Sequence, residues 1–281
     1  MEIPTFDFNT LGDFQKSLEK MEASRSIMPG IPVIARLDGK SFHTFTRGLT
    51  RPFDERLQTC MRETMEYLVD VTNANFGYTQ SDEITLVWQN NDRDADFQYS
   101  GKFQKLASLY ASHASVKFIT SVQAHIPEKK HLLPVFDARV WQVPSVREVI
   151  ENIVWRQLDA SRNSITMAAQ AYYSHKQLHG VGTRKKLQML SDKGIVWNEY
   201  NPHFKRGIFA KRFKYEHTLT TAELSTIPEI HRPTGPVVRS KVMSFELTTS
   251  PAMLHSRVLL DMQDNHVDKL DPAVQLLNTG K

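Results

Sequence analysis

Two short segments carry carboxylates where strand ends could deliver them to a metal ion. The first is Asp38-Gly39-Lys40-Ser41-Phe42-His43, after a compact apolar run, and the second is Ser81-Asp82-Glu83, between two apolar runs. An aspartate at a strand end offers the hard oxygen that Mg²⁺ prefers, and a glycine lets the backbone carbonyl come close. Two such carboxylates side by side could hold two Mg²⁺ ions for nucleotidyl transfer. Each segment alone also fits an ordinary turn.

Further residues could contact phosphate groups. Lys102 and Lys105 are three positions apart, so on a helix they would share one face and could hold a triphosphate. Arg51 and Asp54 precede an expected helix, whose N-terminus favours anions, although capping alone would explain Asp54. Successive N–H groups in the turn after Asp38 could surround phosphate oxygens.

Hydrophobic periodicity predicts the elements that must position these residues. We expect helices over 11–21, 54–73 and 97–118, and strands over 31–37, 76–80, 84–88 and 135–143. From the first strand onward the order is strand, helix, strand, strand, helix, strand, which is the split βαβ arrangement. In that topology the end of the first strand meets the tip of the central hairpin, which would bring Asp38 and Asp82 together. The predicted fold class is α+β, a ferredoxin-like palm with helical and irregular C-terminal additions.

The second half of the chain reads as an addition to this core. We expect helix over 146–177 and 183–192, irregular or extended chain over 198–213, and a strand over 242–247. We expect a palm-like catalytic core with an N-terminal helix over 1–145, and a helical, basic, RNA-facing region with a C-terminal extension over 146–281. The boundary between them is not sharply marked in the sequence. The two parts could equally form one domain.

One stretch of the second half is locally basic and aromatic. Between Gly182 and Tyr215, two acidic residues oppose nine basic ones: Arg184, Lys185, Lys186, Lys193, Lys205, Arg206, Lys211, Arg212 and Lys214. Affinity for a polyanion comes largely from such charges, and interleaved rings such as Trp197 and Phe209 could stack on bases. The alternative is an ordinary solvated face.

Bulk composition narrows the class of protein. The 281 residues are 40% hydrophobic and 23% charged, as in ordinary globular proteins, and the net charge of +4 by itself indicates little. Cys60 is the single cysteine, so neither an internal disulfide nor a cysteine-built zinc site is possible. No apolar run approaches the roughly 18 residues of a membrane helix, and the first residues lack the basic start of a signal peptide. We therefore expect a cytoplasmic enzyme with no membrane partner.

Taken together, these segments resemble the tRNA-His guanylyltransferase family, which includes members that polymerise in the 3′-to-5′ direction. The resemblance covers about residues 31–210 and rests on five motifs in the family's order: 36–45, 80–83, 101–106, 136–139 and 155–159. It implies a palm that adds nucleotides to the 5′ end of tRNA. The 5′ end is first activated with ATP, or arrives as a triphosphate, and the 3′-hydroxyl of GTP then attacks it. Family members are typically homotetramers.

The resemblance also implies roles for individual residues. Asp38 and Asp82 would be catalytic, and with the Gly39 carbonyl they would hold two Mg²⁺ ions. The nucleoside triphosphate would be bound by Asp38, Gly39, Lys40, Ser41, Phe42, His43, Arg51, Asp54, Ser81, Asp82, Lys102 and Lys105. RNA would be contacted by Asn163, Lys186, Lys205 and Arg206.

The chain departs from the family pattern at two places. Phe53 replaces the asparagine of the family's Lys-Pro-Asn-Asp, which removes a polar group near the nucleotide. Residues 161–167 replace the family's His-Ile-Asn-Asn-Leu-Tyr-Asn and keep only Asn163, which favours template-directed 5′-end repair over addition of a guanosine to tRNA-His. Two other functions stay open: a palm that binds RNA without catalysis, and a palm that cyclises nucleotides.

Overall fold

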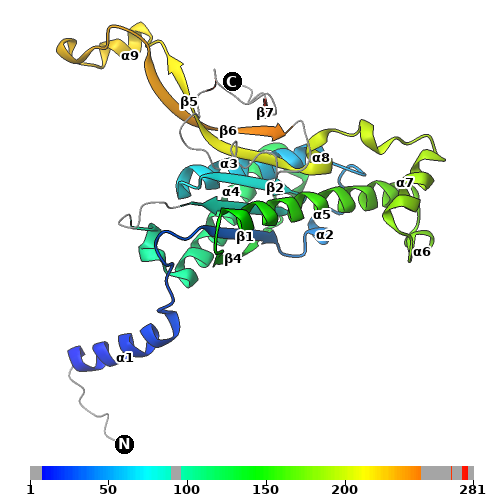
Figure 1. The fold of residues 1–281 in the computed structure, drawn as a ribbon, viewed down its shortest axis with the longest axis horizontal. Coiled ribbons are helices and arrows are strands. Elements are labelled where there is room, and N and C mark those ends of the chain that lie inside the picture. Colours follow the sequence, from blue (N-terminus) through cyan, green and yellow to red (C-terminus); the bar gives the residue numbers. More distant parts are fainter. Residues whose placement is uncertain (1–7, 90–95, 248–266, 268–273, 278–281) are drawn as a thin grey trace, which may run out of the picture.

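The computed structural model describes residues 8–89, 96–247, 267 and 274–277. Helices and strands are mixed along the whole described chain (Figure 1). In chain order the elements are α1 (Phe8–Ala23), β1 (Val33–Gly39), α2 (Phe42–Phe45), α3 (Glu55–Thr72), β2 (Phe76–Gln80), β3 (Glu83–Trp88), α4 (Phe103–His125), β4 (Phe136–Gln142), α5 (Val146–Tyr172), α6 (His175–Leu178), α7 (Thr183–Ser191), α8 (Pro202–Arg206), β5 (Ile208–His217), α9 (Thr221–Ser225), β6 (Val237–Leu247) and β7 (Val274–Leu276).

One antiparallel sheet organises the molecule, with strand order β4-β1-β3-β2-β5-β6-β7. The segment β4-β1-β3-β2 is the order of the split βαβ arrangement, so the predicted palm topology is confirmed. The β2–β3 hairpin turns at Ser81 and Asp82, and Gln80 pairs with Glu83 across it. This topology places the end of β1 beside the tip of that hairpin.

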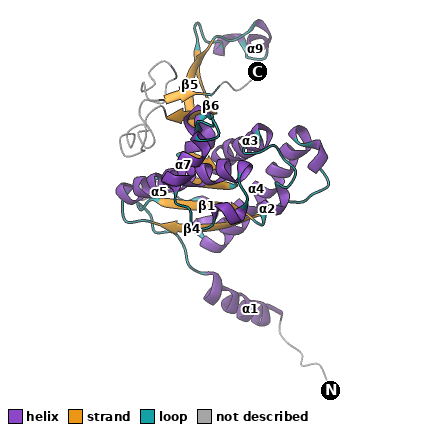
Figure 2. Ribbon diagram, turned by 90° about the vertical axis from the view of Figure 1, so that its right-hand side faces the viewer, coloured by secondary structure: helices purple, strands orange, loops and turns teal. Residues whose placement is uncertain are grey.

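The sheet is covered by helices on both faces (Figures 1 and 2). Side chains alternate along a strand, so Val33, Ala35 and Leu37 pack against α3 and α4, whereas Ile34 packs against α5. Gly77 allows α3 to lie close to β2, because a Cβ there would come within 2.7 Å of Val69 Cγ2. The site residues therefore stand on a sheet held from both sides.

The second long helix begins later than its apolar pattern predicts. Expected from residue 97, α4 starts at Phe103, because Tyr99 and Ser100 adopt left-handed backbone conformations inside a separate 3₁₀ turn. Lys102 lies before the first turn of α4. The expectation that Lys102 and Lys105 share one helix face is therefore wrong.

The described part of the second half contains more helix and strand than the sequence predicts. Residues 202–206 are helical, 208–217 form a ten-residue strand beside β2, and β6 begins at Val237 rather than at 242. β5 and β6 continue as a two-stranded ribbon beyond the body, with α9 near its tip (Figure 1). The sheet thus crosses the expected boundary at residue 145, and the division into two domains stays a prediction.

The N-terminal helix was expected over 11–21 and is present as α1, which stands away from the body (Figures 1 and 2). Among the described residues, no helix is long and apolar enough to cross a bilayer.

Candidate functional site

The two aspartate segments meet at one end of the sheet. The Gly39 N–H donates to the carbonyl oxygen of Asp82 at 3.1 Å, and Asp38 lies directly opposite Glu83 in the β1–β3 register. Ser81 holds the tight turn in a left-handed conformation, with φ 51°, and its hydroxyl donates to Asp82 Oδ1 at 3.0 Å. The structure thus brings Asp38 and Asp82 together, as the topology predicts.

The neighbouring carboxylates at this end of the sheet repel one another. Burial and the charge of Asp38 raise the pKa of Asp82. Burial and the charge of Asp137 raise the pKa of Asp38, while Arg139, Arg36 and Arg156 partly offset that rise. Asp137 faces Asp38 from β4 and was not predicted from the sequence, although pairing β4 with β1 would have located it. Several carboxylates held this close produce a local excess of negative charge that a cation would relieve.

A buried ion pair lies behind the hairpin tip. The guanidinium of Arg156, on α5, contacts Glu83 at 2.9 Å and also pairs with Asp159. Burial raises the pKa of Glu83 to about 7, although the positive charges of Arg156 and Arg36 act in the opposite direction. The hairpin that carries Asp82 is thereby tied to α5.

A pocket of about 690 Å³ opens beside this end of the sheet. Its walls come from the end of β1, from α2, from the chain entering α3, from the β2–β3 turn, from α5 and from α8. Nine residues predicted to bind nucleotide or RNA line it: Gly39, Ser41, Phe42, His43, Arg51, Asp54, Ser81, Asp82 and Asn163. Several lining residues were not predicted, including Arg47, Thr50, Phe53, Gln58, Gln170 and Phe204.

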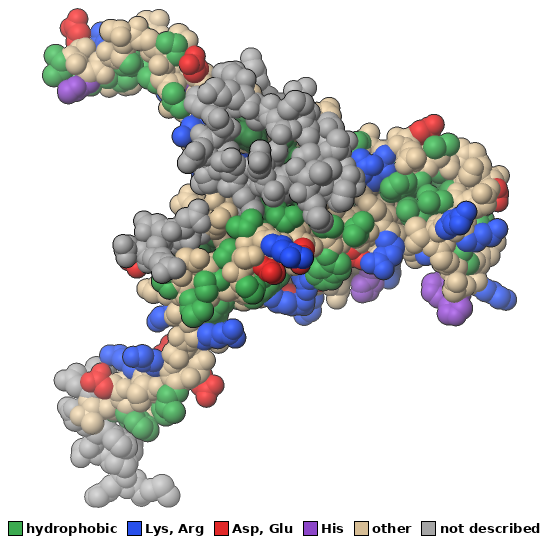
Figure 3. Space-filling view, viewed as in Figure 1, with side chains coloured by type: hydrophobic (Ala, Val, Ile, Leu, Met, Phe, Trp, Pro, Cys, Tyr) green, Lys and Arg blue, Asp and Glu red, His purple; other side chains and the backbone are tan. Residues whose placement is uncertain are grey.

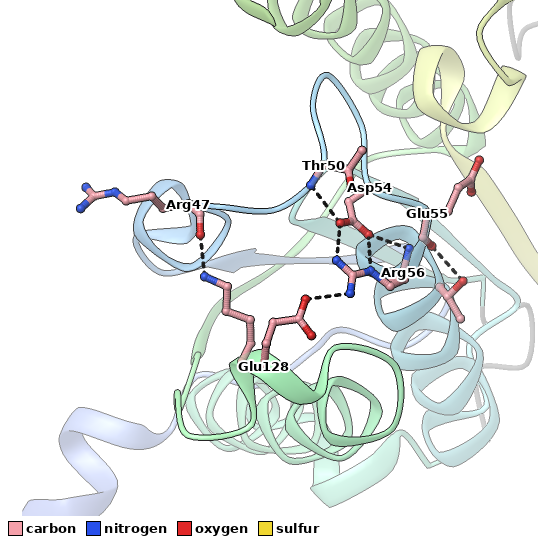
Figure 4. A network of polar contacts seen from close by, with 8 residues as sticks. Arg47, Thr50, Asp54, Glu55, Arg56 and Glu128 are labelled. Carbon is pink, nitrogen blue, oxygen red and sulfur yellow. Dashed lines mark hydrogen bonds and ion pairs between the residues drawn. The ribbon is translucent and has the colours of Figure 1, made fainter.

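Asp54 forms part of the pocket wall, but its carboxylate is engaged by its own loop. It accepts from the backbone N–H groups of Thr50 at 3.1 Å and Arg56 at 3.0 Å, and from the Arg56 guanidinium at 2.8 and 3.1 Å. Arg56 also contacts Glu128 at 2.7 Å (Figure 4). Burial alone would raise the pKa of Asp54, but these donors lower it to about 2. The described contacts make Asp54 a residue that fixes the loop and caps α3.

Four predicted nucleotide ligands do not line the pocket, and one of them, Asp38, lies beside it next to the lining residue Gly39 at the end of β1. The Lys40 side chain is exposed, and its backbone N–H donates to Val135. Lys102 and Lys105 lie at the start of α4, near the far end of β3, where Trp88 stacks on Tyr110. From Trp88 to Glu83, strand β3 spans roughly 17 Å. Within one chain these two lysines are therefore remote from Asp38 and Asp82, because α4 starts at the end of the sheet opposite to the hairpin tip.

The predicted RNA contacts fall into different environments. Asn163 is exposed at the pocket and donates to Asp159 at 3.2 Å, Lys186 donates to Thr166 Oγ1 at 3.1 Å, and Arg206 is partly exposed. Lys205 is only 5% exposed, and its ammonium donates to the Asn198 carbonyl beneath the Trp197 ring. The expectation that Lys205 faces RNA is wrong, because packing of α8 encloses its ammonium.

The basic stretch does not form one continuous surface. Lys211 is buried, Arg212 pairs with Asp70, and Phe209 and Phe213 belong to the core. Exposed cations remain around α6 and α7, where Lys and Arg side chains gather at one end of the molecule (Figure 3). The aromatic residues of this stretch were predicted to stack on bases. Phe209 and Phe213 instead pack into the protein core from β5.

The donor set at the hairpin tip fits Mg²⁺. Carboxylate oxygens of Asp38 and Asp82, with a nearby backbone carbonyl from Gly39, are ligands of the hard type that this ion takes. Among the described residues, no group of three or more His, Cys, Asp or Glu is arranged to hold a metal ion. Mg²⁺ commonly takes one or two protein carboxylates and completes its shell with water and substrate phosphate oxygens.

Comparisons with known proteins agree with this geometry. The model of the Thg1 family, described as tRNAHis guanylyltransferase, matches residues 15–144. The chain is 36% identical to a bacterial tRNA(His) guanylyltransferase (Thg1)-like protein solved in complex with ATP, covering 72% of this chain and 86% of that one, with a TM-score of 0.67.

Two further relatives extend the match. A bacterial Thg1-like protein in complex with GTP is 28% identical, with coverage of 90% of this chain and 97% of that one and a TM-score of 0.67. The tRNA(His) guanylyltransferase of Debaryomyces hansenii is 25% identical over 225 residues, which is 74% of this chain and 83% of the yeast protein.

Proposed function

The chain belongs to the tRNAHis guanylyltransferase family, Thg1, and from that premise we propose that it is a nucleotidyltransferase that adds nucleotides to the 5′ end of tRNA. GTP and ATP are its proposed substrates, since similar proteins were solved in complex with each. The single observation that carries the proposal is the meeting of Asp38 and Asp82 beside a pocket large enough for a nucleotide.

Each part of this end would have its own role. Asp38, Asp82 and the Gly39 carbonyl would hold two Mg²⁺ ions, which when bound supply activation of the attacking hydroxyl and neutralise charge on the transferred phosphoryl group. Ser41, His43 and Ser81 line the pocket near these carboxylates and would orient the triphosphate. The Glu83–Arg156 pair would keep the Asp82 turn in place.

The RNA would approach along α5 and α7. Asn163 stands at the pocket, and Lys186 and Arg206 are the predicted cations with partly exposed side chains. The changed segment 161–167 supports a role in 5′-end repair of truncated tRNA rather than strict addition to tRNA-His. A homotetramer is proposed on the family resemblance alone.

The two rival functions are less well supported. A palm that only binds RNA would gain nothing from such crowded carboxylates, in which Asp38 raises the pKa of Asp82 and Asp137 raises that of Asp38. Crowding of this kind costs stability unless it serves a ligand. A nucleotide cyclase would use the same aspartates, but it would not need exposed cations around α7.

The test is incorporation of labelled GTP into intact and 5′-truncated tRNA with ATP and Mg²⁺. Asp38→Asn and Asp82→Asn should each lower the rate at least about 100-fold, as loss of groups that support a metal ion does. Asp13→Asn is the matched control, because Asp13 is exposed on α1 and pairs only with Lys16 among the described contacts.

The outcomes separate the candidates. Incorporation of label at the 5′ end by the wild type and by Asp13→Asn, but not by the two active-site variants, supports the transferase function. RNA binding without transfer, unchanged in both active-site variants, would indicate the scaffold, and a cyclic nucleotide product would indicate the cyclase. Preference for truncated over intact tRNA supports the repair role.

A further inference from the structure

A histidine of α8 lies between two carboxylates from distant parts of the chain. The Nε2 of His203 lies 3.1 Å from Glu55 Oε2, at the start of α3, and its Nδ1 lies 3.1 Å from Glu246 Oε1, on β6. The amide of Asn201 adds a hydrogen bond to Glu55 Oε1 at 2.7 Å. The side chains of His203 and Glu246 are only 14% and 8% exposed. These contacts tie α8 to α3 and to β6 at once.

The position of α8 shapes one wall of the pocket. Phe204, next to His203, lines the pocket and stacks on Phe53 from the chain entering α3, with ring centroids 4.6 Å apart and planes 10° apart. The His203 ring packs against Phe204 at 4.2 Å between centroids. The bridge from His203 to Glu55 therefore holds the two sides of this wall, α8 and the start of α3, against each other.

The complete bridge needs a doubly protonated ring. An ionised carboxylate only accepts hydrogen bonds, and a neutral imidazole has one N–H donor, whereas an imidazolium has two. A neutral His203 could therefore donate to Glu55 or to Glu246 but not to both, and the other carboxylate would face a lone pair. Glu246 is buried, so the loss of its donor would carry a desolvation cost.

The other charged groups near this ring come from α8 itself. Burial and the charge of Arg206 lower the pKa of Lys205, whereas the charge of Glu246 acts in the opposite direction. α5 and β2 also pack against α8, but they contribute hydroxyl groups: Ser161 donates to the Lys205 carbonyl and Tyr78 to the Arg206 carbonyl. Histidine is the side chain that ordinarily changes charge between about pH 5 and 8, so the ring is the part of this bridge that responds to pH near neutrality.

We propose that His203 is a positioning residue whose imidazolium holds the α8 wall of the pocket against the start of α3. The proposal rests on the proposed function, because it makes nucleotide binding in that pocket depend on pH. A histidine ordinarily loses its charge between about pH 5 and 8, so the bridge is complete below this range and is lost as the pH rises through it. Phe204 is then no longer held against Phe53, and a nucleotide in the pocket binds less tightly.

The test compares GTP affinities at two pH values. Calorimetry on the full chain with Mg²⁺, at about pH 6 and about pH 8.5, brackets the usual histidine range. His203→Gln is uncharged at both values, so it should bind GTP about fivefold more weakly than wild type at the lower pH and within about twofold at the higher one. Comparison with wild type at the same pH cancels the titration of the nucleotide's own phosphates. His231→Gln is the matched control, because His231 is exposed and does not line the pocket.

A second variant tests the bridge from its other end. The amide of Glu246→Gln can donate to the unprotonated nitrogen of a neutral ring, so it restores the missing hydrogen bond at high pH. This variant should match wild-type GTP affinity at the lower pH and bind GTP about fivefold more tightly than wild type at the higher one.

Thermal unfolding of the same proteins separates a positioning role from a purely structural one. A lower Tm for His203→Gln with unchanged GTP affinity at both pH values would mean that the ring serves only the fold. Equal weakening of GTP at both pH values would mean that the ring acts by packing rather than by charge. Either result would overturn the proposal and leave the proposed function intact, since wild type still binds GTP. Wild type that binds no GTP at either pH would overturn both.

Discussion

Aspartates of this chain that look alike in sequence stand in opposite electrostatic environments. Asp38 and Asp82 are crowded by burial and by other carboxylates, which raises their pKa values. Asp54 instead accepts from Arg56 and from the N–H of Thr50, which lowers its pKa to about 2. Asp38 and Asp82, as carboxylates that repel one another, are suited to bind cations. Asp54, whose carboxylate oxygens already accept hydrogen bonds from its own loop, stabilises the fold.

Asp54→Asn should therefore act on stability and depend on pH. The folded-state pKa lies below the ordinary value of 3.8, so the stabilising contribution is present above pH 3.8 and is lost as the pH falls toward about 2. We expect a loss of about 2 kcal/mol in the free energy of unfolding at pH 7, and a clearly smaller loss at pH 3. Urea titrations of both proteins at the two pH values measure this, and an equal loss at both would contradict it.

At the scale of elements, α5 holds the functional end together. Arg156 pairs with Glu83 of the hairpin and with Asp159 of its own helix, and it lies 4.1 Å from the centre of the Trp155 ring. Two turns after Arg156, α5 carries Asn163, which lines the pocket. A change in the position of α5 would therefore move the Asp82 turn and the pocket wall together.

Arg156→Met should lower the free energy of unfolding by about 3 kcal/mol, because it leaves the buried Glu83 without its cation. The double variant Arg156→Met with Glu83→Leu should lose less than the sum of the single changes, since the unpaired charge is gone. Arg147→Met, at an exposed pair with Glu151, should change stability by less than about 0.5 kcal/mol. Additive losses in denaturant titrations would show that the pair does not couple the two elements.

At the scale of the whole molecule, β5 and β6 complete the sheet of the palm. Phe209, Phe213 and Phe245 share a buried cluster with Ile34 and Phe76 from the first half of the chain. Beyond them, His217 still pairs with Val237, but most of the ribbon is exposed. The base of the ribbon thus belongs to the core, and its outer part does not.

Truncation after Arg206 should abolish cooperative unfolding, because it exposes one side of β2 and the aromatic cluster behind it. Removing only residues 218–236 and joining His217 to Val237 through Asn-Gly should keep the Tm within about 3 °C, since these two residues already face each other. Calorimetric scans compare the two proteins. Equal loss of the transition in both would mean that the outer ribbon also carries the fold.

Local patterns predicted the catalytic end well. The apolar runs specify four strands and two helices, and few topologies accept that order, so the meeting of Asp38 and Asp82 follows from the sequence. The helix N-cap at Asp54 is equally local, since it depends on residues within one turn.

Only the tertiary structure decided which side chains can reach a ligand. The sequence shows that Lys205, Lys102 and Lys105 are basic, but packing of α8 buries the first and the start of α4 places the others far from the pocket. The bridge from His203 to Glu55 and Glu246 likewise appears only when α8 is set against α3 and β6. Periodicity is a property of neighbours along the chain, whereas burial and pairing depend on elements that are distant in sequence and meet only on folding.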